Sequence, residues 1–305
     1  MLSIATHYNV LDMPELPEVE TVRVGLQRLL PGRFITSVDF DWPKGFPNAP
    51  SDVNAFLIGA KIVAVRRRAK VLMIDLSSEY SLVVHLKMTG QLVFRGTENF
   101  GAGHPNESLI GDLPDKSTRV TLTFKDGSKL FFNDQRKFGW VRLIPTIEIP
   151  NIDFMKKVGP EPLEATFTSE VFIERLKRRK NSNIKAVLLD QSVLAGIGNI
   201  YADEALFAAH IHPTSITGVI PETKVRDLHR EIVAVLKLSI EKGGSTDRNY
   251  VNAEGMRGNY IDFAMVFRRE KQPCPVCGHE ISKTKVAGRG THTCEHCQIT
   301  YVVAT

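Results

Sequence analysis

Apolar residues near the start of the chain recur at the spacing of an α-helix. The recurring positions are Val19, Val22, Leu26 and Leu29. Intervals of three and four residues place these side chains on one face, so the pattern predicts a helix over residues 15–30. Glu15, Glu18 and Glu20 lie in its first turns, where the helix dipole favours negative charge. Pro31-Gly32 ends the helix.

Residues 34–144 follow a different pattern, in which turns separate short runs of β-branched and apolar residues. The predicted strands are Lys61–Val65, Val71–Leu76, Ser81–Leu86, Arg119–Phe124, Lys129–Phe132 and Trp140–Leu143. A sandwich or a barrel is the natural packing for such strands. The stretch Gly96–Ser117 is polar and rich in glycine and proline, so it predicts a long loop.

Helical periodicity returns after residue 150. The predicted helices are Phe172–Lys180, Ile184–Asp190, Ile200–Ala209 and Glu222–Lys242. Gly243-Gly244 ends the last of them, and residues 245–262, which are polar and aperiodic, predict a mobile loop. This change from a mainly β part to a mainly helical part describes an architecture and does not identify a function.

The cysteines of the chain all lie near its C-terminal end. They are Cys274, Cys277, Cys294 and Cys297. Two C-x2-C pairs match a four-cysteine zinc site, because each pair can supply two thiolates to one tetrahedral metal. Two disulfides are the alternative, which a cytoplasmic chain disfavours. Four protein ligands leave no open position, so the spacing predicts one structural Zn²⁺.

The composition is that of a globular protein, with 43% hydrophobic and 24% charged residues among 305. At roughly 150 residues per domain, this length suggests about two domains. No apolar run approaches the roughly 18 residues of a membrane span. Residues 1–12 lack the features of a secretory signal, so we expect a cytoplasmic location. The net charge of +5 is compatible with a polyanionic partner such as DNA or RNA.

Five segments together carry a family resemblance. They are Met13-Pro14-Glu15-Leu16-Pro17-Glu18-Val19-Glu20-Thr21, Arg68-Ala69-Lys70, His85-Leu86-Lys87-Met88-Thr89-Gly90, Gly196-Ile197-Gly198-Asn199-Ile200-Tyr201-Ala202, and the cysteine module with Arg289 inside it. In this order they resemble the formamidopyrimidine-DNA glycosylases (Fpg, also called MutM), from residue 13 to about residue 300. The related endonuclease VIII enzymes usually have glycine at the position of Leu16.

The resemblance implies an α+β multidomain fold. Its expected parts are a catalytic domain of an N-terminal helix and a β-sandwich (13–147), a DNA-binding helix–two-turns–helix domain (148–265) and a four-cysteine zinc finger (266–305), with residues 1–12 as an extension. The resemblance also implies base-excision repair of oxidised purines, mainly 8-oxoguanine and formamidopyrimidines, with AP lyase activity by β- and δ-elimination.

The resemblance assigns catalysis to Pro14, Glu15, Lys70 and Arg289. In this family the proline after the initiator methionine is the nucleophile. An α-amino group with a pKa near 8 is far more nucleophilic at neutral pH than a lysine with a pKa of about 10.4. The Glu15 carboxylate can transfer protons to the sugar oxygen, and Lys70 matches the family's essential β-domain lysine. By residue type alone, Pro14 would be only a first-turn proline and Glu15 a helix-dipole acid.

Three further residues match family positions that fill the gap left by an extruded base. A glycosylase must flip its target nucleotide out of the duplex to reach the sugar carbon. Met88 and Phe138 are the expected wedges, and Arg136 is the expected hydrogen-bond donor to the orphaned cytosine. Without the resemblance, the methionine and the phenylalanine would be assigned to a hydrophobic core.

DNA contacts are also implied for Lys185, Asn199 and Arg289. Asn199 is a good helix N-cap, and the two glycines before it predict a phosphate site at a helix N-terminus. The segment that begins at Gly243 matches the family's damaged-base recognition loop, which orders on a flipped base. The residues assigned to this loop are Ser245, Thr246 and Tyr260.

The expected partner is double-stranded DNA with oxidised bases, bound by a monomer in the nucleoid. One alternative is an oxidised-pyrimidine glycosylase of the endonuclease VIII type, which Leu16 disfavours. The other is a non-catalytic binder of damaged DNA, which follows if Pro14 never gains a free amine. While residues 1–12 remain attached, the nitrogen of Pro14 is an amide without a reactive lone pair. We therefore expect translation from Met13 followed by removal of that methionine, or later removal of the extension.

Overall fold

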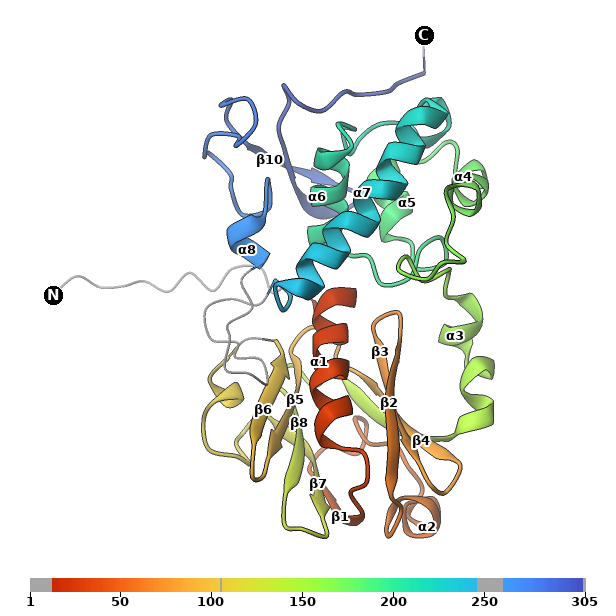
Figure 1. Ribbon diagram of the computed structural model, residues 1–305, viewed down its shortest axis with the longest axis vertical. Helices are drawn as coiled ribbons and strands as arrows, with labels where there is room; N and C mark the ends of the chain where they lie inside the picture. Colours follow the sequence, from red (N-terminus) through yellow and green to blue (C-terminus); the bar gives the residue numbers. More distant parts are fainter. Residues whose placement is uncertain (1–12, 105, 246–259, 304–305) are drawn as a thin grey trace, which may run out of the picture.

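The computed structural model describes residues 13–104, 106–245 and 260–303. A β domain forms one end of the molecule, and a helical domain with a small two-stranded module forms the other (Figure 1). Helix α1 (Leu16–Leu29) stands where the two ends meet. The predicted α+β multidomain class is confirmed.

Two antiparallel sheets form the β domain. The five-stranded sheet has the order β1 (Ile35–Phe40), β7 (Thr118–Phe124), β8 (Lys129–Asp134), β5 (Gly90–Arg95) and β6 (Asn99–Gly103). The four-stranded sheet has the order β2 (Ile62–Arg68), β3 (Val71–Leu76), β4 (Tyr80–His85) and β9 (Trp140–Pro145). Two short helical segments, α2 (Pro50–Asp52) and η1 (Val53–Leu57), lie between β1 and β2.

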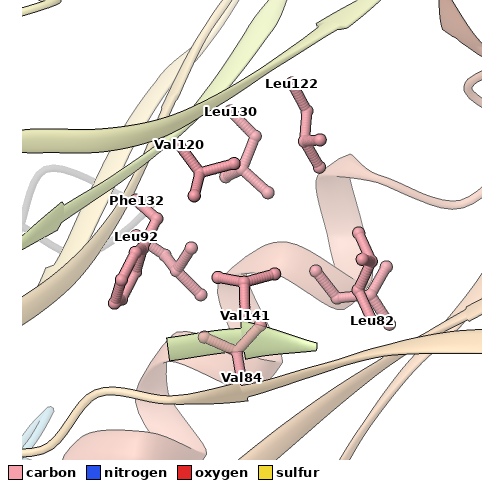
Figure 2. A pocket seen from close by; sticks show the side chains of 9 residues that line it. Leu82, Val84, Leu92, Val120, Leu122, Leu130, Phe132 and Val141 are labelled. Atoms are coloured by element: carbon pink, nitrogen blue, oxygen red, sulfur yellow. The ribbon is translucent and has the colours of Figure 1, made fainter. Parts of the chain in front are cut away.

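The space between the two sheets is a closed apolar core. Figure 2 shows side chains of the four-stranded sheet, among them Leu82 and Val141, facing side chains of the five-stranded sheet, among them Leu92 and Leu130. The cavity that remains measures about 10 Å³, which is no more than one water molecule needs. The sandwich interior is therefore packed, and the functional site must lie outside it.

Helix α1 begins and ends one residue inside its predicted limits. The Glu18 carboxylate accepts a hydrogen bond from the backbone N–H of Glu15 at 2.9 Å, which satisfies a donor that the first turn leaves unpaired. All four predicted apolar positions are buried. The helix packs against β2, β3, β6 and α7 (Glu222–Glu241), so it contacts both sheets and the helical domain.

The predicted loop over Gly96–Ser117 is wrong in part, because it contains strand β6 and the short helix η2 (Glu107–Leu109). Strand β6 has no β-branched residue, so its own propensity does not predict it. It forms because it pairs with β5, and because Phe100 packs against Gly25 of α1. A Cβ at Gly25 would lie 2.2 Å from that ring. Strands β1 and β5 were not predicted individually either.

The helical domain is built around α6. Its helices are α3 (Asp153–Lys157), α4 (Ser169–Lys177), α5 (Ile184–Leu189), α6 (Asn199–Ala208), α7 and α8 (Tyr260–Phe263), with the short turns η3 (Thr146–Asn151) and η4 (Thr217–Val219). The four predicted helices are confirmed, although their ends differ by up to three residues. Helix α6 is buried nearly all round, as expected for a central helix.

The two-stranded module lies between the cysteine pairs. Strands β10 (Ser282–Val286) and β11 (Arg289–Thr293) pair antiparallel through a turn at Ala287-Gly288. Strand β11 packs against α6, so the module is attached to the helical domain. Among the described residues, no helix is both long and apolar enough to cross a membrane.

Candidate active site

The start of α1 is buried against the glycine-containing loop before α6. Pro14 and Glu15 are both buried. The Oε1 atom of Glu15 accepts a hydrogen bond from the backbone N–H of Ile200 at 3.0 Å. A Cβ at Gly198 would lie 2.3 Å from the Glu15 carboxyl carbon. Any larger residue at position 198 would therefore displace the Glu15 carboxyl group from this position.

This contact changes the role expected for the N-terminus of α6. A backbone N–H that was predicted to bind phosphate donates instead to Glu15. The prediction that Asn199 is the N-cap is wrong, because Gly198 occupies that position and Asn199 is the first helical residue. The Oδ1 atom of Asn199 is buried, and none of the described residues donates a hydrogen bond to it.

Lys70 lies in the turn between β2 and β3 and is only 5% exposed. Burial lowers the pKa of its ammonium, Glu15 and Glu18 oppose that change, and Arg289 lowers the pKa further. Arg289 is exposed at the start of β11. The fold thus brings Glu15 and Arg289 within electrostatic range of Lys70, although these three predicted catalytic residues lie far apart in the sequence.

A carboxylate from the segment between the domains holds the turn that carries Lys70. Ala69 has a left-handed backbone, with φ 52°, which costs a non-glycine residue roughly 1–2 kcal/mol. Glu161, which is 2% exposed, accepts hydrogen bonds from the N–H of Ala69 and from Arg67 at 2.7 Å, and pairs with Arg68 at 3.2 Å. Sequence reasoning missed this residue. Its only signal is a single acid between two prolines in an aperiodic segment.

Glu18 is a second functional candidate that sequence reasoning missed, since it was treated only as a helix-dipole acid. Its Oε1 atom accepts hydrogen bonds from the hydroxyl of Tyr201 at 2.5 Å and from the N–H and hydroxyl of Ser245 at 2.7 and 2.8 Å. Burial, followed by the nearby carboxylates, raises the pKa of Tyr201 well above its usual value, so this hydroxyl stays a donor. Glu18 therefore ties α1 to α6 and to the start of the predicted lesion loop.

The ends of the predicted lesion-recognition loop meet at its base. The N–H of Tyr260 donates to the carbonyl of Gly244 at 3.2 Å. Tyr260 is 1% exposed, and its ring lies 5.4 Å from that of Tyr201 in the core of the helical domain. This placement does not agree with a side chain that reads a bound base. Ser245 lies at the loop base, and Thr246 lies outside the described residues.

Met88, Arg136 and Phe138 come together on the surface of the β domain. The Nη1 atom of Arg136 lies 3.2 Å from the sulfur of Met88. The guanidinium carbon of Arg136 lies 4.9 Å from the centre of the Phe138 ring, which is 52% exposed. A thioether, a guanidinium and an aromatic ring from two separate turns therefore form one surface group, in which Arg136 and Phe138 are exposed and Met88 is half-buried.

Lys185 was expected to contact DNA, but its side chain is buried. Its side chain is 0% exposed, and its Nζ atom lies 2.6 Å from a carboxylate oxygen of Asp203. It also donates to the hydroxyl of Thr291 at 2.7 Å and to the carbonyl of Gly290 at 3.1 Å. The prediction of a direct DNA contact disagrees with this burial. Lys185 instead joins α5 and α6 to β11, next to Arg289.

The four cysteines converge at the loops that flank β10 and β11. Their sulfur atoms all lie within 4.8 Å of one another, which fits four ligands of one tetrahedral ion. The sulfurs of Cys277 and Cys294 are 3.4 Å apart and those of Cys274 and Cys297 are 3.9 Å apart, whereas a disulfide requires about 2 Å. The arrangement therefore fits a structural zinc and not two disulfides.

Family models match the chain in three successive segments. The formamidopyrimidine-DNA glycosylase N-terminal domain matches residues 13–141, and the formamidopyrimidine-DNA glycosylase H2TH domain matches residues 158–250. The zinc finger found in FPG and IleRS matches residues 271–299. The module with four cysteines is accordingly a zinc finger with one structural zinc.

Whole-chain relatives agree with these matches. The chain is 42% identical over 287 residues to a formamidopyrimidine-DNA glycosylase of Pelotomaculum thermopropionicum, covering 94% of this chain and 99% of the relative. It superimposes with a TM-score of 0.82 on a mutant of the Lactococcus lactis enzyme in complex with a Fapy-dG containing DNA, at 35% identity and covering 93% and 99% of the two chains. The MutM protein of Thermus thermophilus gives a TM-score of 0.79 at 36% identity, covering 93% and 98%.

Proposed function

The chain belongs to the formamidopyrimidine-DNA glycosylase family and is a DNA glycosylase of base-excision repair, and we propose that it removes oxidised purines through the amine of Pro14 and then cleaves the strand. Its partner is DNA, and the proposed substrate is duplex DNA that contains 8-oxoguanine or a formamidopyrimidine. The complex of the Lactococcus lactis relative with a Fapy-dG containing DNA supports this choice.

The observation that carries the mechanism is the buried position of Lys70 within electrostatic range of Glu18, Arg289 and Glu15, the residue that follows Pro14. A carboxylate pair and two cations around an N-terminal amine can hold a sugar with its phosphate and can move protons at the sugar oxygen. Within this cluster, Glu15 is the proton donor and acceptor. Lys70 and Arg289 bind the phosphates that flank the lesion.

The proposed reaction begins when the lone pair of the Pro14 nitrogen attacks C1′ of the damaged nucleotide. The bond between C1′ and the base breaks, and the base leaves with the bonding electrons and takes up a proton. The Pro14 nitrogen gives up its proton to Glu15, which protonates the ring oxygen, so the sugar opens and an iminium ion forms with Pro14. The iminium draws electrons from C2′, which loses a proton as the 3′-phosphate leaves in β-elimination. A second elimination then releases the 5′-phosphate.

Extrusion of the damaged nucleotide is assigned to the surface group of Met88, Arg136 and Phe138. The two apolar side chains replace stacking that is lost when the nucleotide leaves the duplex. The Arg136 guanidinium donates hydrogen bonds to cytosine, which offers acceptors where adenine offers few. We therefore propose faster excision of 8-oxoguanine opposite cytosine than opposite adenine.

Further DNA contacts complete the proposal. Asn199 joins Arg289 at the phosphates, and the segment that starts at Ser245 is assigned to recognition of the flipped base. Because Lys185 and Tyr260 are buried, we assign them positioning roles instead of contacts. The protein is proposed to act as a monomer in the nucleoid, with its three domains divided at 13–147, 148–265 and 266–305.

Borohydride trapping tests the role of Pro14. Borohydride reduces the iminium, so an enzyme that uses this amine becomes covalently bound to lesion DNA. We expect trapping by protein whose first residue is Pro14 and none by protein that retains residues 1–13, because an amide nitrogen cannot attack C1′. Undamaged duplex of the same sequence is the control. Efficient trapping by the longer protein would shift the assignment to a lysine.

A further inference from the structure

Two surface turns of the β domain meet at one buried carboxylate. The first turn, Leu86–Thr89, joins β4 to β5 and carries Met88. The second, Gln135–Gly139, joins β8 to β9 and carries Arg136 and Phe138. Asp134 is the last residue of β8 and is 1% exposed.

The Asp134 carboxylate accepts hydrogen bonds from both turns. Its Oδ1 atom accepts from the hydroxyl of Thr89 in the first turn and from the N–H of Arg136 in the second, at 3.2 Å. Its Oδ2 atom accepts from the N–H of Gly139, at 2.6 Å. The Thr89 hydroxyl itself lies 3.1 Å from the Arg136 nitrogen, so the two turns also contact each other directly.

Both turns need such support, because each contains a strained residue. Lys87 and Lys137 have left-handed backbones, with φ 52° and 57°, which each cost a non-glycine residue roughly 1–2 kcal/mol. Gly139 leaves the room that the carboxylate uses, since a Cβ there would lie 3.1 Å from Oδ2 of Asp134 and 2.6 Å from the ring of Phe132. Without a shared anchor, each turn could relax separately.

We propose that Asp134 is a positioning residue that couples the turn of Met88 to the turn of Arg136 and Phe138. The two apolar side chains and the arginine that contacts the opposite base then enter DNA together. The inference rests on the proposed function for the identity of its substrate. Arg136 contacts both Met88 and Phe138 at the surface, and Asp134 fixes the backbone beneath all three. Asp134 itself touches no DNA.

The test is the substitution Asp134→Asn, which keeps the size of the side chain but turns one acceptor oxygen into an N–H₂ donor. That donor must face either the N–H of Gly139 or the N–H of Arg136, so in both orientations the Gln135–Gly139 turn loses one of its two hydrogen bonds to the side chain of residue 134. We expect the ratio of excision rates opposite cytosine and opposite adenine to fall roughly tenfold, the effect of losing one charge-assisted hydrogen bond. Trapping on a single-stranded abasic site, which needs no wedge, should persist.

A second measurement does not depend on the chemistry. When 2-aminopurine is placed opposite a tetrahydrofuran site, its fluorescence reports insertion of the wedge into DNA that cannot be cleaved. We expect wild-type protein to change this signal and Asp134→Asn to lose most of the change. If the proposed mechanism is wrong, wild-type protein will not be trapped but will still change this fluorescence. The experiment therefore distinguishes a failure of the Pro14 mechanism from a failure of the Asp134 proposal.

Two further variants keep the test decisive. Thr89→Val removes the hydroxyl from the same junction at nearly constant volume, and it should reproduce the loss in a milder form if Asp134→Asn proves unstable. Asp75→Asn is the matched control, since Asp75 accepts hydrogen bonds from Ser81 and Arg66 on the other sheet, away from both turns. The inference is overturned if Asp134→Asn and Thr89→Val keep the wild-type ratio and signal, or if Asp75→Asn alters them equally.

Discussion

The Glu15 carboxylate accepts a hydrogen bond from the backbone N–H of Ile200, 185 positions further along the chain, at 3.0 Å. Ile200 lies in the first turn of α6, where unpaired N–H groups and the helix dipole favour a negative charge. The helical domain thus fixes the position of the proposed proton-transfer group of the β domain. Assembly of the proposed active site consequently requires both domains.

Glu15→Gln separates this positioning role from proton transfer. A glutamine oxygen can still accept from Ile200, but the side chain can no longer donate or take up a proton at the sugar. We expect release of 8-oxoguanine to fall about 10²–10⁴-fold while the variant still cleaves a preformed abasic site. Single-turnover assays on the two substrates measure this. Glu98→Gln, at an exposed ion pair with Arg28, is the control and should act as wild type. Equal losses on both substrates would contradict the assignment.

Removal of zinc should affect DNA binding without unfolding the β domain. Cys294 is one of the four sulfur ligands and is 0% exposed. We expect Cys294→Ser to lose the metal and to unfold the zinc finger, which carries Arg289. Both tryptophans, Trp42 and Trp140, lie in the β domain. We therefore expect zinc content and DNA affinity to be lost while tryptophan emission stays native. A native-like affinity in zinc-free protein would contradict this role.

Lys185→Met should destabilise the protein, because it leaves the Asp203 carboxylate buried without its cation. Breaking a buried pair in this way costs roughly 3–5 kcal/mol in the free energy of unfolding. Lys185→Met combined with Asp203→Asn should recover part of that loss, since no unpaired charge remains. Urea unfolding of the two variants measures the coupling. If Lys185 were instead a surface DNA contact, the single variant would unfold like wild type.

Arg289→Ala should weaken binding through phosphates and not through recognition of the lesion. Arg289 is exposed at the start of β11, close enough to Lys70 to lower its pKa. We expect affinity for lesion and undamaged duplex to fall alike, and the salt dependence of binding to decrease by about one unit of slope. Binding titrations over a range of salt concentrations measure both. An unchanged slope would indicate a purely structural role for this arginine.

Stability should fall on acidification because His85 must stay neutral in the folded protein. Its Nδ1 atom accepts the N–H of Lys87, and burial, together with Lys87 and Lys70, lowers its pKa to about 3. The unfolded chain takes up this proton near pH 6.5, so the contribution is complete above that pH and is lost as the pH falls towards about 3. Urea unfolding at several pH values should show a steeper loss for wild type than for His85→Asn, whose side-chain oxygen can accept the same N–H. Parallel curves would exclude His85 as the cause.

Local patterns in the sequence determined much of this protein. The period of apolar residues in α1 and the spacing of the cysteines specify their structures, because neighbours along the chain set helical faces and chelate geometry. The family motifs point to Pro14, to Lys70 and to the group of Met88, Arg136 and Phe138 without any information on the fold.

Tertiary structure decided which of these side chains are buried and what they contact. Lys185 is a buried partner of Asp203, and Tyr260 is part of the core of the helical domain. Asp134 and Glu161 accept hydrogen bonds from strained turns. Each outcome depends on residues far away in the sequence, and burial makes an unpaired polar group costly. Local propensity contains no information on those distant partners, so only the packed domains fix the roles of these residues.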